Sequence, residues 1–471
     1  MSNKKVIKAG IGYTIGNYLL KGLSFFVIPI FTRLLSTEDY GIYNVFLSYA
    51  NVAFVLIGIA IHNSYKRAFY TFNTSNEKED YYSYVSTTML IIIFITVVFL
   101  LISNIFTGFI YNVLKIDRLS INLVILCGFG NAIICCFNSD SSLNYDYIKY
   151  IKIAGVNAVS NVLLSIILIY TVFNQKRYMG RILGSVIPIM LISFFIIIYF
   201  FKRHKPKNIK EYVVWGVSYS LPLVPHGLSQ IILNQFDRIM ILNMVSSGAS
   251  GIYSFAYNIY AIVQVTGDSL GNVWETWFYE LRNNNDFEEI RRNSSYFMVL
   301  MLIFSSIVIF ISPELIKLFA NNNYWESIYS VIPIVAAGYF SFIYTIPANV
   351  EYYHGKTKFI AIGTAIAAIL NITLNYFFIN KFGYISAAYT TLFTYLVYFL
   401  LHYFIAKKIE GFYLFSNKVV VMCVILMLIT VTIGNLVINY FVIRAILVLI
   451  MIAVGFLYEE KNVGFLRKRL K

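Results

Sequence analysis

Charged side chains inside long apolar stretches are the most informative chemistry-bearing residues of this sequence. Lys21 lies roughly ten residues inside the first apolar run, too deep to reach a membrane surface easily. Its ammonium group could bind a functional partner, form a structural ion pair, or reach the membrane surface through an extended side chain. Asp268 and Glu275 lie seven residues apart in another run, near one face of a helix. These acids, like Glu351 and His354, have two possible roles: they couple transport to an ion or proton, or they form ordinary ion pairs at a solvated helix end.

Two pairs of asparagines, each spaced by one helical turn, form a second set of polar residues. Asn157 and Asn161 lie in one apolar segment, and Asn371 and Asn375 lie in another. Residues four apart share a helix face, so each pair can line a polar cleft or tie neighbouring helices together. The sequence favours the second role but leaves the first one open.

Motifs of soluble catalysis are absent or incomplete. The stretch Gly355–Thr357 reads GKT, but a phosphate-binding loop needs glycine at position 350, which is Val350. Gly10–Gly12 fails as a dinucleotide fingerprint because position 15 is Ile15. Four cysteines lie in apolar runs without a C-x-x-C pair: Cys127, Cys135, Cys136 and Cys423. They are typical of small core residues rather than of metal ligands. The sequence therefore predicts no enzyme, no cofactor and no metal site.

The composition predicts that a lipid bilayer surrounds the elements that position these residues. Of the 471 residues, 59% are hydrophobic and 13% are charged, against about 45–50% and about 25% in soluble domains. This excludes a soluble globular enzyme, a disordered chain and a disulfide scaffold. A spanning helix needs about 20 apolar residues, which predicts about 14 spans. Their approximate limits are 10–33, 41–62, 84–110, 119–140, 150–173, 179–201, 212–236, 250–279, 294–318, 326–351, 358–379, 384–406, 417–438 and 440–458.

The distribution of lysine and arginine predicts the orientation of these spans. With the N-terminus inside, 26 of the 37 basic residues fall in inner segments, 10 fall in outer segments, and Lys21 lies within the first span. The bias favours two cytoplasmic termini and an even number of spans. We interpret the first apolar run as an uncleaved span. The longest hydrophilic stretches are too short for a folded domain, so we expect no ATPase domain.

An internal repeat predicts the domain organisation. Phe31–Arg33 precedes Gly41–Tyr43, and Phe236–Arg238 precedes Gly251–Tyr253, at an offset of about 205–210 residues. Spans one to six then match spans seven to twelve in the same sense, as in two-lobed transporters; chance similarity between apolar segments is the alternative. The predicted parts are an N-terminal lobe at 1–201, a basic linker at 202–211, a C-terminal lobe at 212–406, and two further helices with a basic tail at 407–471. Pro222, Pro225 and Gly227 break span seven and are the predicted hinge.

Three groups of motifs resemble one family of bacterial transporters. They are R-L-L-S-x-x-x-Y-G-I-Y at Arg33–Tyr43, N-Q-F-D-R at Asn234–Arg238 with G-I-Y-S-x-A-Y at Gly251–Tyr257, and L-N-x-x-L-N at Leu370–Asn375 with F-G-Y-x-x-A-A at Phe382–Ala388. In this order, over about residues 1–406, they resemble the Wzx-type oligosaccharide-lipid flippases. These form the polysaccharide transporter branch of the multidrug/oligosaccharidyl-lipid/polysaccharide (MOP) exporter superfamily.

The resemblance implies an all-α polytopic membrane protein, with two six-helix lobes in a V-shaped cleft and two extra helices. It implies a monomeric flippase in the bacterial cytoplasmic membrane. Such proteins move undecaprenyl-diphosphate-linked oligosaccharides to the outer leaflet for O-antigen, capsule or exopolysaccharide synthesis. Polysaccharide polymerase and glycosyltransferases are the implied partners. The resemblance does not identify the sugar that the protein moves.

The diphosphate headgroup that the resemblance implies would need fixed cations in a wet cleft. Lys21 is the sharpest candidate. The others lie at the ends of predicted spans and could equally be interfacial anchors or positive-inside residues: Arg33, Lys66, Arg67, Lys152, Arg181 and Arg238. Asp268 and Glu275 are the candidates for ion coupling, and the four asparagines are the candidates for contact with sugar hydroxyls.

Two other functions compete with this one. An ion-coupled multidrug antiporter of the same superfamily would need acids in the N-terminal lobe, where Asp140 and Asp146 lie near an inner end. An integral membrane polysaccharide-assembly enzyme would need a large outer loop or a catalytic His/Asp pair. Spans one to six hold few acids, and neither a large outer loop nor a catalytic His/Asp pair is found in the sequence, so both functions stay secondary.

Overall fold

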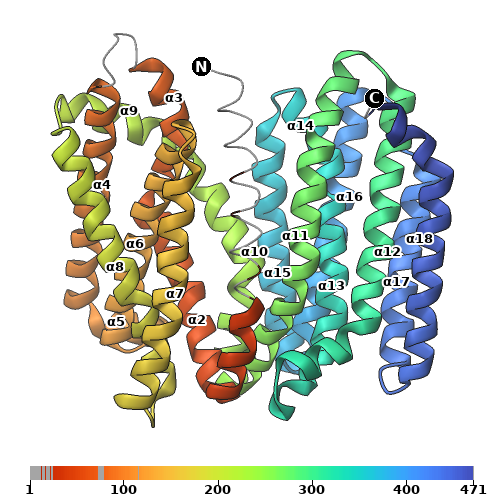
Figure 1. The fold of residues 1–471 in the computed structure, drawn as a ribbon, viewed down its shortest axis with the longest axis horizontal. Coiled ribbons are helices and arrows are strands. Elements are labelled where there is room, and N and C mark those ends of the chain that lie inside the picture. Colours follow the sequence, from red (N-terminus) through yellow and green to blue (C-terminus); the bar gives the residue numbers. More distant parts are fainter. Residues whose placement is uncertain are drawn as a thin grey trace. The chain divides into compact units, whose positions relative to one another are not determined.

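The computed structural model describes residues 25–72, 79–114 and 116–469, together with Gly12, Gly16 and Gly22. In these ranges the secondary structure is helical throughout, without a strand (Figure 1). Eleven of the described helices are long and apolar enough to cross a membrane. The chain is therefore a polytopic all-α membrane protein.

Contacts between residues divide the chain into two compact units, Met1–Gly248 and Ala249–Lys471. This division falls later than the predicted linker at 202–211, because α10 packs against α2 and α9 packs against α4 in the first unit. The lobe boundaries that the internal repeat indicates stay a prediction.

The described part of the first unit contains an apolar helix at Phe25–Leu34 and eleven further α-helical or 3-10 elements. These are α2 (Thr37–Gly58), η1 (Ile61–Ser64), α3 (Tyr65–Thr71), α4 (Glu79–Ile105), α5 (Thr107–Leu114), α6 (Arg118–Leu143), α7 (Tyr147–Thr171), α8 (Arg177–Arg203), α9 (Ile209–Ser220) with η2 (Leu221–Leu223), and α10 (Val224–Met244). Small residues let the long helices approach closely. A Cβ atom on Gly184 of α8 would lie 2.5 Å from Ser165 Cα on α7, and one on Gly128 of α6 would lie 2.8 Å from the Ala53 backbone on α2.

The second unit consists of long helices around a buried α13. Its elements are α11 (Ser247–Asn283, beginning just before the division), α12 (Phe287–Phe319), η3 (Asn322–Ser327), α13 (Ile328–Ile343), α14 (Thr345–Tyr353), α15 (Thr357–Phe382), α16 (Ser386–Glu410), α17 (Asn417–Leu436) and α18 (Phe441–Arg469). Helices α12 and α16 pack against α13, and α17 and α18 pack against α12. Arg444 of α18 donates to both Glu314 carboxylate oxygens of α12, at 2.5 and 2.8 Å, which fastens the last helix to the unit.

Most predicted spans coincide with observed helices, and the differences have local causes. The second span ends at Gly58 rather than near 62, because Ile59 and Ala60 adopt left-handed backbone angles with φ of 40° and 55°. The break predicted at Pro222 and Pro225 is present as η2 between α9 and α10. Whether the break acts as a hinge stays a prediction.

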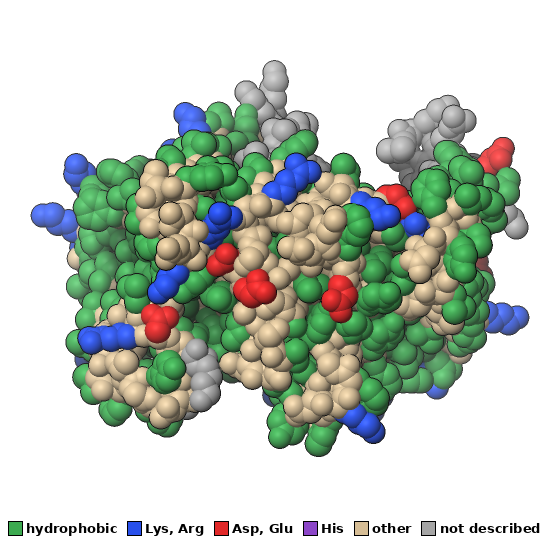
Figure 2. Space-filling view, turned by 90° about the horizontal axis from the view of Figure 1, so that it is seen from below, with side chains coloured by type: hydrophobic (Ala, Val, Ile, Leu, Met, Phe, Trp, Pro, Cys, Tyr) green, Lys and Arg blue, Asp and Glu red, His purple; other side chains and the backbone are tan. Residues whose placement is uncertain are grey.

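Exposed apolar side chains mark the surfaces that face lipid. In the spanning segments of α7 and α18, 11% and 6% of the residues are buried inside the protein, and both helices are strongly apolar. Such surfaces would be costly in water but suit a bilayer. Figure 2, which views the ends of the helices, shows acidic and basic side chains among hydrophobic ones there.

Candidate functional site

An open groove with a volume of about 1060 Å³ lies at the end of the first unit where α3 and the beginning of α9 are found (Figure 1). Its lining combines two basic residues, one acid, amide and hydroxyl groups, and two large aromatic rings. The lining residues are Arg67, Asn208, Ile209, Lys210, Glu211, Val214, Trp215, Ser218 and Tyr219. This mixture suits a ligand that carries both an anionic group and a flat apolar face.

The aromatic side of the groove is built by helix periodicity. Trp215 and Tyr219 are four residues apart on α9, and their rings stack with centroids 6.2 Å apart and an interplanar angle of 8°. Phe72 and Tyr84 contact the Trp215 ring edge to face, with centroid distances of 5.0 and 5.3 Å. These contacts hold the indole in one orientation while it stays only half-buried.

Arg67 of α3 covers both rings. Its guanidinium carbon lies 5.6 Å from the ring centroid of Trp215 and 5.6 Å from that of Tyr219. The Arg67 side chain is exposed, and it has no recorded hydrogen bond or ion pair with another described residue. Its N–H donors are therefore available, in a planar group that can bind a phosphate through two parallel hydrogen bonds. Lys66 is exposed beside it.

The loop that precedes α9, together with the first turn of α9, carries lysines near the groove. Lys207 pairs with Glu79 of α4, and this hydrogen bond raises the pKa of the Lys207 ammonium. Lys207 therefore stays charged at neutral pH. Lys205 and Lys210 are exposed in the same stretch.

Arg181 has a different environment, although the sequence grouped it with Arg67. Its side chain is 8% exposed and donates to Asn161 Oδ1 and, at 2.8 Å, to Ser165 Oγ of α7. Its guanidinium carbon also lies 3.8 Å from the ring centroid of Phe31 and 4.6 Å from that of Tyr43. The structure thus joins two predicted site residues, Arg181 and Asn161, in a buried contact between helices.

The remaining predicted cations of the first unit are dispersed. Lys152 lines an apolar groove of about 410 Å³ between α7 and α8, together with Lys149. Arg33 is exposed at the end of its helix. Arg238 is half-buried and lies six residues before the end of α10, so it does not end the seventh span as we expected. Lys21 lies outside the described residues. The diphosphate role stays a prediction for all of them.

The predicted asparagines are buried to different degrees. Asn371 and Asn375 of α15 are fully buried; Asn371 donates to Thr391 of α16 at 3.2 Å, and Asn375 donates to Asn371 at 3.1 Å. The bond to Thr391, and a bond that Asn375 accepts from Thr390 of α16, tie α15 to α16. Asn157 of α7 is partly exposed, and its buried Oδ1 has no hydrogen-bond partner among the described residues. Contact with a polar ligand stays a prediction.

The acids of α11 lie on a polar face of a helix in the second unit. Asp268 and Glu275 are exposed, as are Asn272 between them and Gln264 one turn before Asp268 on the same side. A polar stripe on a membrane helix requires water or protein rather than lipid against it. Ion coupling by these acids stays a prediction.

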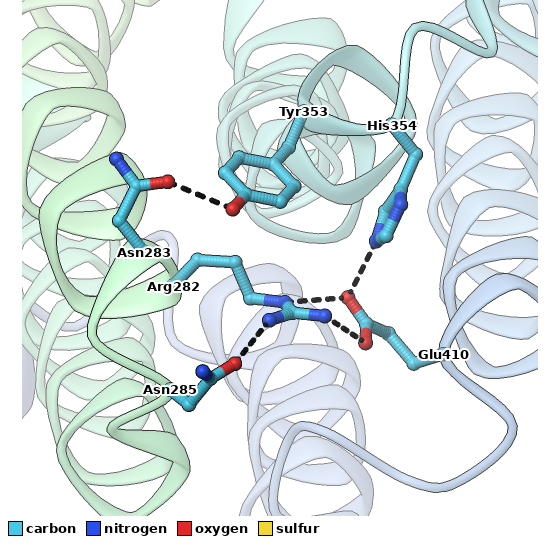
Figure 3. Close-up of polar contacts among 6 residues, drawn as sticks. All are labelled: Arg282, Asn283, Asn285, Tyr353, His354 and Glu410. Atoms are coloured by element: carbon cyan, nitrogen blue, oxygen red, sulfur yellow. Dashed lines mark hydrogen bonds and ion pairs between the residues drawn. The ribbon is translucent and has the colours of Figure 1, made fainter.

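An ion-pair cluster lies at the end of α11 (Figure 3). Arg282 donates to both Glu410 carboxylate oxygens of α16, at 3.1 Å each, and His354 Nε2 lies 3.1 Å from Glu410 Oε1. Arg282 also donates to Asn285 at 2.8 Å, and Tyr353 donates to Asn283 at 2.8 Å. His354 is therefore part of a packed polar cluster. Among the described residues, no group of three His, Cys, Asp or Glu side chains could hold a metal ion.

Sequence comparison matches residues 6–273 to the profile of a family described as polysaccharide biosynthesis protein. A protein of the lsg locus of Haemophilus influenzae is 20% identical over 388 residues, covering 78% of this chain and 90% of that protein. A Shigella flexneri protein named as an O-antigen transporter is 25% identical over 158 residues, covering 32% of this chain and 37% of that protein.

Two solved structures show the same fold. The lipid II flippase MurJ, in an inward closed conformation, superposes with a TM-score of 0.72 at 17% identity, over 98% of this chain and all of that one. An inward-facing multidrug resistance MATE family transporter of the MOP superfamily superposes with a TM-score of 0.64 at 13% identity, over 83% of this chain and 95% of that one.

Proposed function

Since the chain belongs to the polysaccharide biosynthesis protein family, we propose that it is a flippase for lipid-linked glycans. Its proposed cargo is an undecaprenyl-diphosphate-linked oligosaccharide, moved by alternating access from the cytoplasmic to the outer leaflet of the bacterial cytoplasmic membrane. The names of relatives support this, because one is an O-antigen transporter and another is a lipid II flippase. The transported unit would serve the assembly of a surface polysaccharide.

The observation that carries the proposal is the groove that Arg67 shares with Trp215 and Tyr219. The guanidinium carbon lies 5.6 Å from each ring centroid, and its N–H donors, which have no partner among the described residues, are available to a diphosphate. The exposed part of the rings offers a flat apolar surface to a sugar. Lys210 and Glu211 add a cation and a carboxylate within reach of glycan hydroxyls. A cationic drug, the cargo of an antiporter, is poorly suited to a groove with this charge.

The position of the groove agrees with the proposed direction of transport. With both termini in the cytoplasm, as the distribution of lysine and arginine favours, α3 and the beginning of α9 lie on the cytoplasmic side. A lipid-linked glycan that moves outward must be bound there first. Lys21, deep in the first span, is the proposed second contact of the diphosphate. Polysaccharide polymerase and glycosyltransferases are the proposed partners of a monomeric flippase.

The test is complementation of a strain that lacks this protein, with surface polysaccharide and protein abundance both measured. We expect Arg67→Ala and Trp215→Ala each to lower polysaccharide export at least about tenfold, the effect of losing roughly 1.4 kcal/mol of binding, at normal abundance. Arg67→Lys should keep part of the activity, because it preserves charge but not the planar fork. Lys21→Ala should abolish export.

Arg203 supplies the matched control. It is an exposed arginine whose guanidinium carbon lies 3.9 Å from the ring centroid of Tyr82, but it does not line the groove. Arg203→Ala should therefore export polysaccharide as the wild type does. Full export by both Arg67→Ala and Trp215→Ala would overturn the assignment of the groove.

A further inference from the structure

A glutamate and a histidine form a completely buried pair in the second unit. Glu351 lies on α14 and His402 on α16, and both side chains are 0% exposed. His402 Nδ1 is 2.5 Å from Glu351 Oε1. The other two polar atoms of the pair, Glu351 Oε2 and His402 Nε2, are buried and have no hydrogen-bond partner in the described part of the chain.

Neutral groups from α15, α16 and the junction of α13 and α14 lie around the pair. The Tyr344 and Tyr398 rings contact the His402 ring, with centroids 5.7 and 4.6 Å away. From α15, a Cβ atom on Gly363 would lie 2.8 Å from His402 Nε2, so the backbone closes that side. Tyr398 itself is hydrogen-bonded to Thr364 of α15 at 2.9 Å.

Charged groups are found on α11 and in the cluster at the ends of α11, α14 and α16. Glu275 of α11 interacts electrostatically with Tyr352, which also interacts with Glu351. The Arg282–Glu410–His354 cluster already has its charges balanced internally. No lysine or arginine has a recorded ion pair with Glu351 among the described residues.

Burial then decides how many protons the pair holds. A carboxylate beside a neutral imidazole would leave one negative charge in the protein interior, with no cation to offset it. One added proton removes this charge, either as imidazolium beside carboxylate or as carboxylic acid beside imidazole. The closed arrangement in this structure therefore favours the pair with one proton. Losing the proton requires water or movement of a helix.

We propose that Glu351 and His402 form the proton-binding site that couples a proton gradient to transport. This rests on the proposed flippase function. In each cycle the pair takes one proton from water on the outer side, which forms one N–H or O–H bond, and this bond breaks when the pair gives the proton to water on the cytoplasmic side; no electrons are transferred. Influx of one proton then accompanies outward movement of one anionic lipid.

The local backbone provides a means of opening the site. The helix is interrupted at Tyr344, between α13 and α14, and Pro347 cannot donate a backbone hydrogen bond to the preceding turn. Glu351 lies on the short α14 that follows this break. Tyr352, next to it, is 45% exposed and interacts with the exposed Glu275. A tilt of α14 would thus connect Glu351 to the polar face of α11.

The first arm of the test measures the proton without any cargo. Infrared difference spectra of the purified full chain, titrated from about pH 5 to about pH 9, should show a carboxyl or imidazole signal. We expect Glu351→Gln and His402→Gln each to remove this signal. The control Glu314→Gln, a carboxylate of another ion pair in the same unit, should retain it. If a single variant does not fold, the double variant, whose two amides can bond to each other, replaces it.

The second arm measures coupling in proteoliposomes. The probe is the lipid-linked oligosaccharide that accumulates in the deletion strain. With one proton per cycle, the transmembrane ratio of the probe should change about tenfold per unit of pH gradient in the wild type and in Glu314→Gln. In Glu351→Gln the ratio should not respond to the gradient.

The two arms separate this inference from the proposed function. Loss of the infrared signal in the variants, with no transport of the probe by any form, would support the proton site and refute the flippase assignment. Transport that responds to the pH gradient equally in the wild type and Glu351→Gln would overturn the proton site and leave the flippase assignment intact. An infrared signal that persists in both single variants would also overturn it.

Discussion

Replacing Arg181 with methionine is expected to destabilise the protein by about 2–4 kcal/mol. The guanidinium donates to Asn161 and Ser165, and hydrogen bonds of charged groups contribute about 1.5–3 kcal/mol each. Its position over Phe31 and Tyr43 adds about 2 kcal/mol. Burial of the Arg181 guanidinium offsets part of these gains, because desolvation of a charged group that is 8% exposed costs several kcal/mol. A methionine at this position does not incur that cost.

Unfolding of the purified protein in lipid nanodiscs measures this difference. Arg177 is the matched control, because it lies one turn earlier on α8, is exposed, and donates to the Leu34 carbonyl at 2.9 Å. Arg177→Met should change the free energy of unfolding by less than about 1 kcal/mol. Adding Asn161→Leu to Arg181→Met should recover part of the lost stability, because the amide oxygen is then no longer left without a donor.

One combination of results would refute the reasoning. If Arg181→Met unfolds like the wild type but no longer restores polysaccharide export, the contacts of Arg181 do not stabilise the helix pair. Arg181 would then act on the cargo, the other role that the sequence allows.

Two further substitutions test the packing of the helices. Arg444→Met should lower the free energy of unfolding by about 2 kcal/mol and expose α18 to protease, because it breaks the bidentate pair with Glu314. The effect stays this small because the Glu314 side chain is 40% exposed, so that water partly screens the pair. Unchanged proteolysis would contradict this prediction. Gly184→Ala should cost about 1–3 kcal/mol in thermal unfolding, because its Cβ would lie 2.5 Å from Ser165 Cα. Gly155→Ala, with nothing within 4 Å, is the control and should not be destabilised.

The sequence by itself determined the membrane architecture, because the bilayer imposes a length and a polarity on every span. The predicted spans 358–379 and 417–438 match α15 and α17 to within a few residues. The break near Pro222 was also visible, since proline lacks the backbone N–H that a continuous helix needs. The left-handed residues after Gly58, and the short α3 that follows them, carry no such signal.

The partners of the polar residues were decided by the tertiary structure. Arg67 was a candidate cation from its place in the sequence, but Trp215 and Tyr219 lie on a helix about 150 residues later and read as ordinary interfacial aromatics. Glu351 was an ambiguous acid at a helix end until His402 was found against it. Hydropathy depends on the local composition of each span, whereas such contacts depend on the rotation and approach of helices that are distant in the chain.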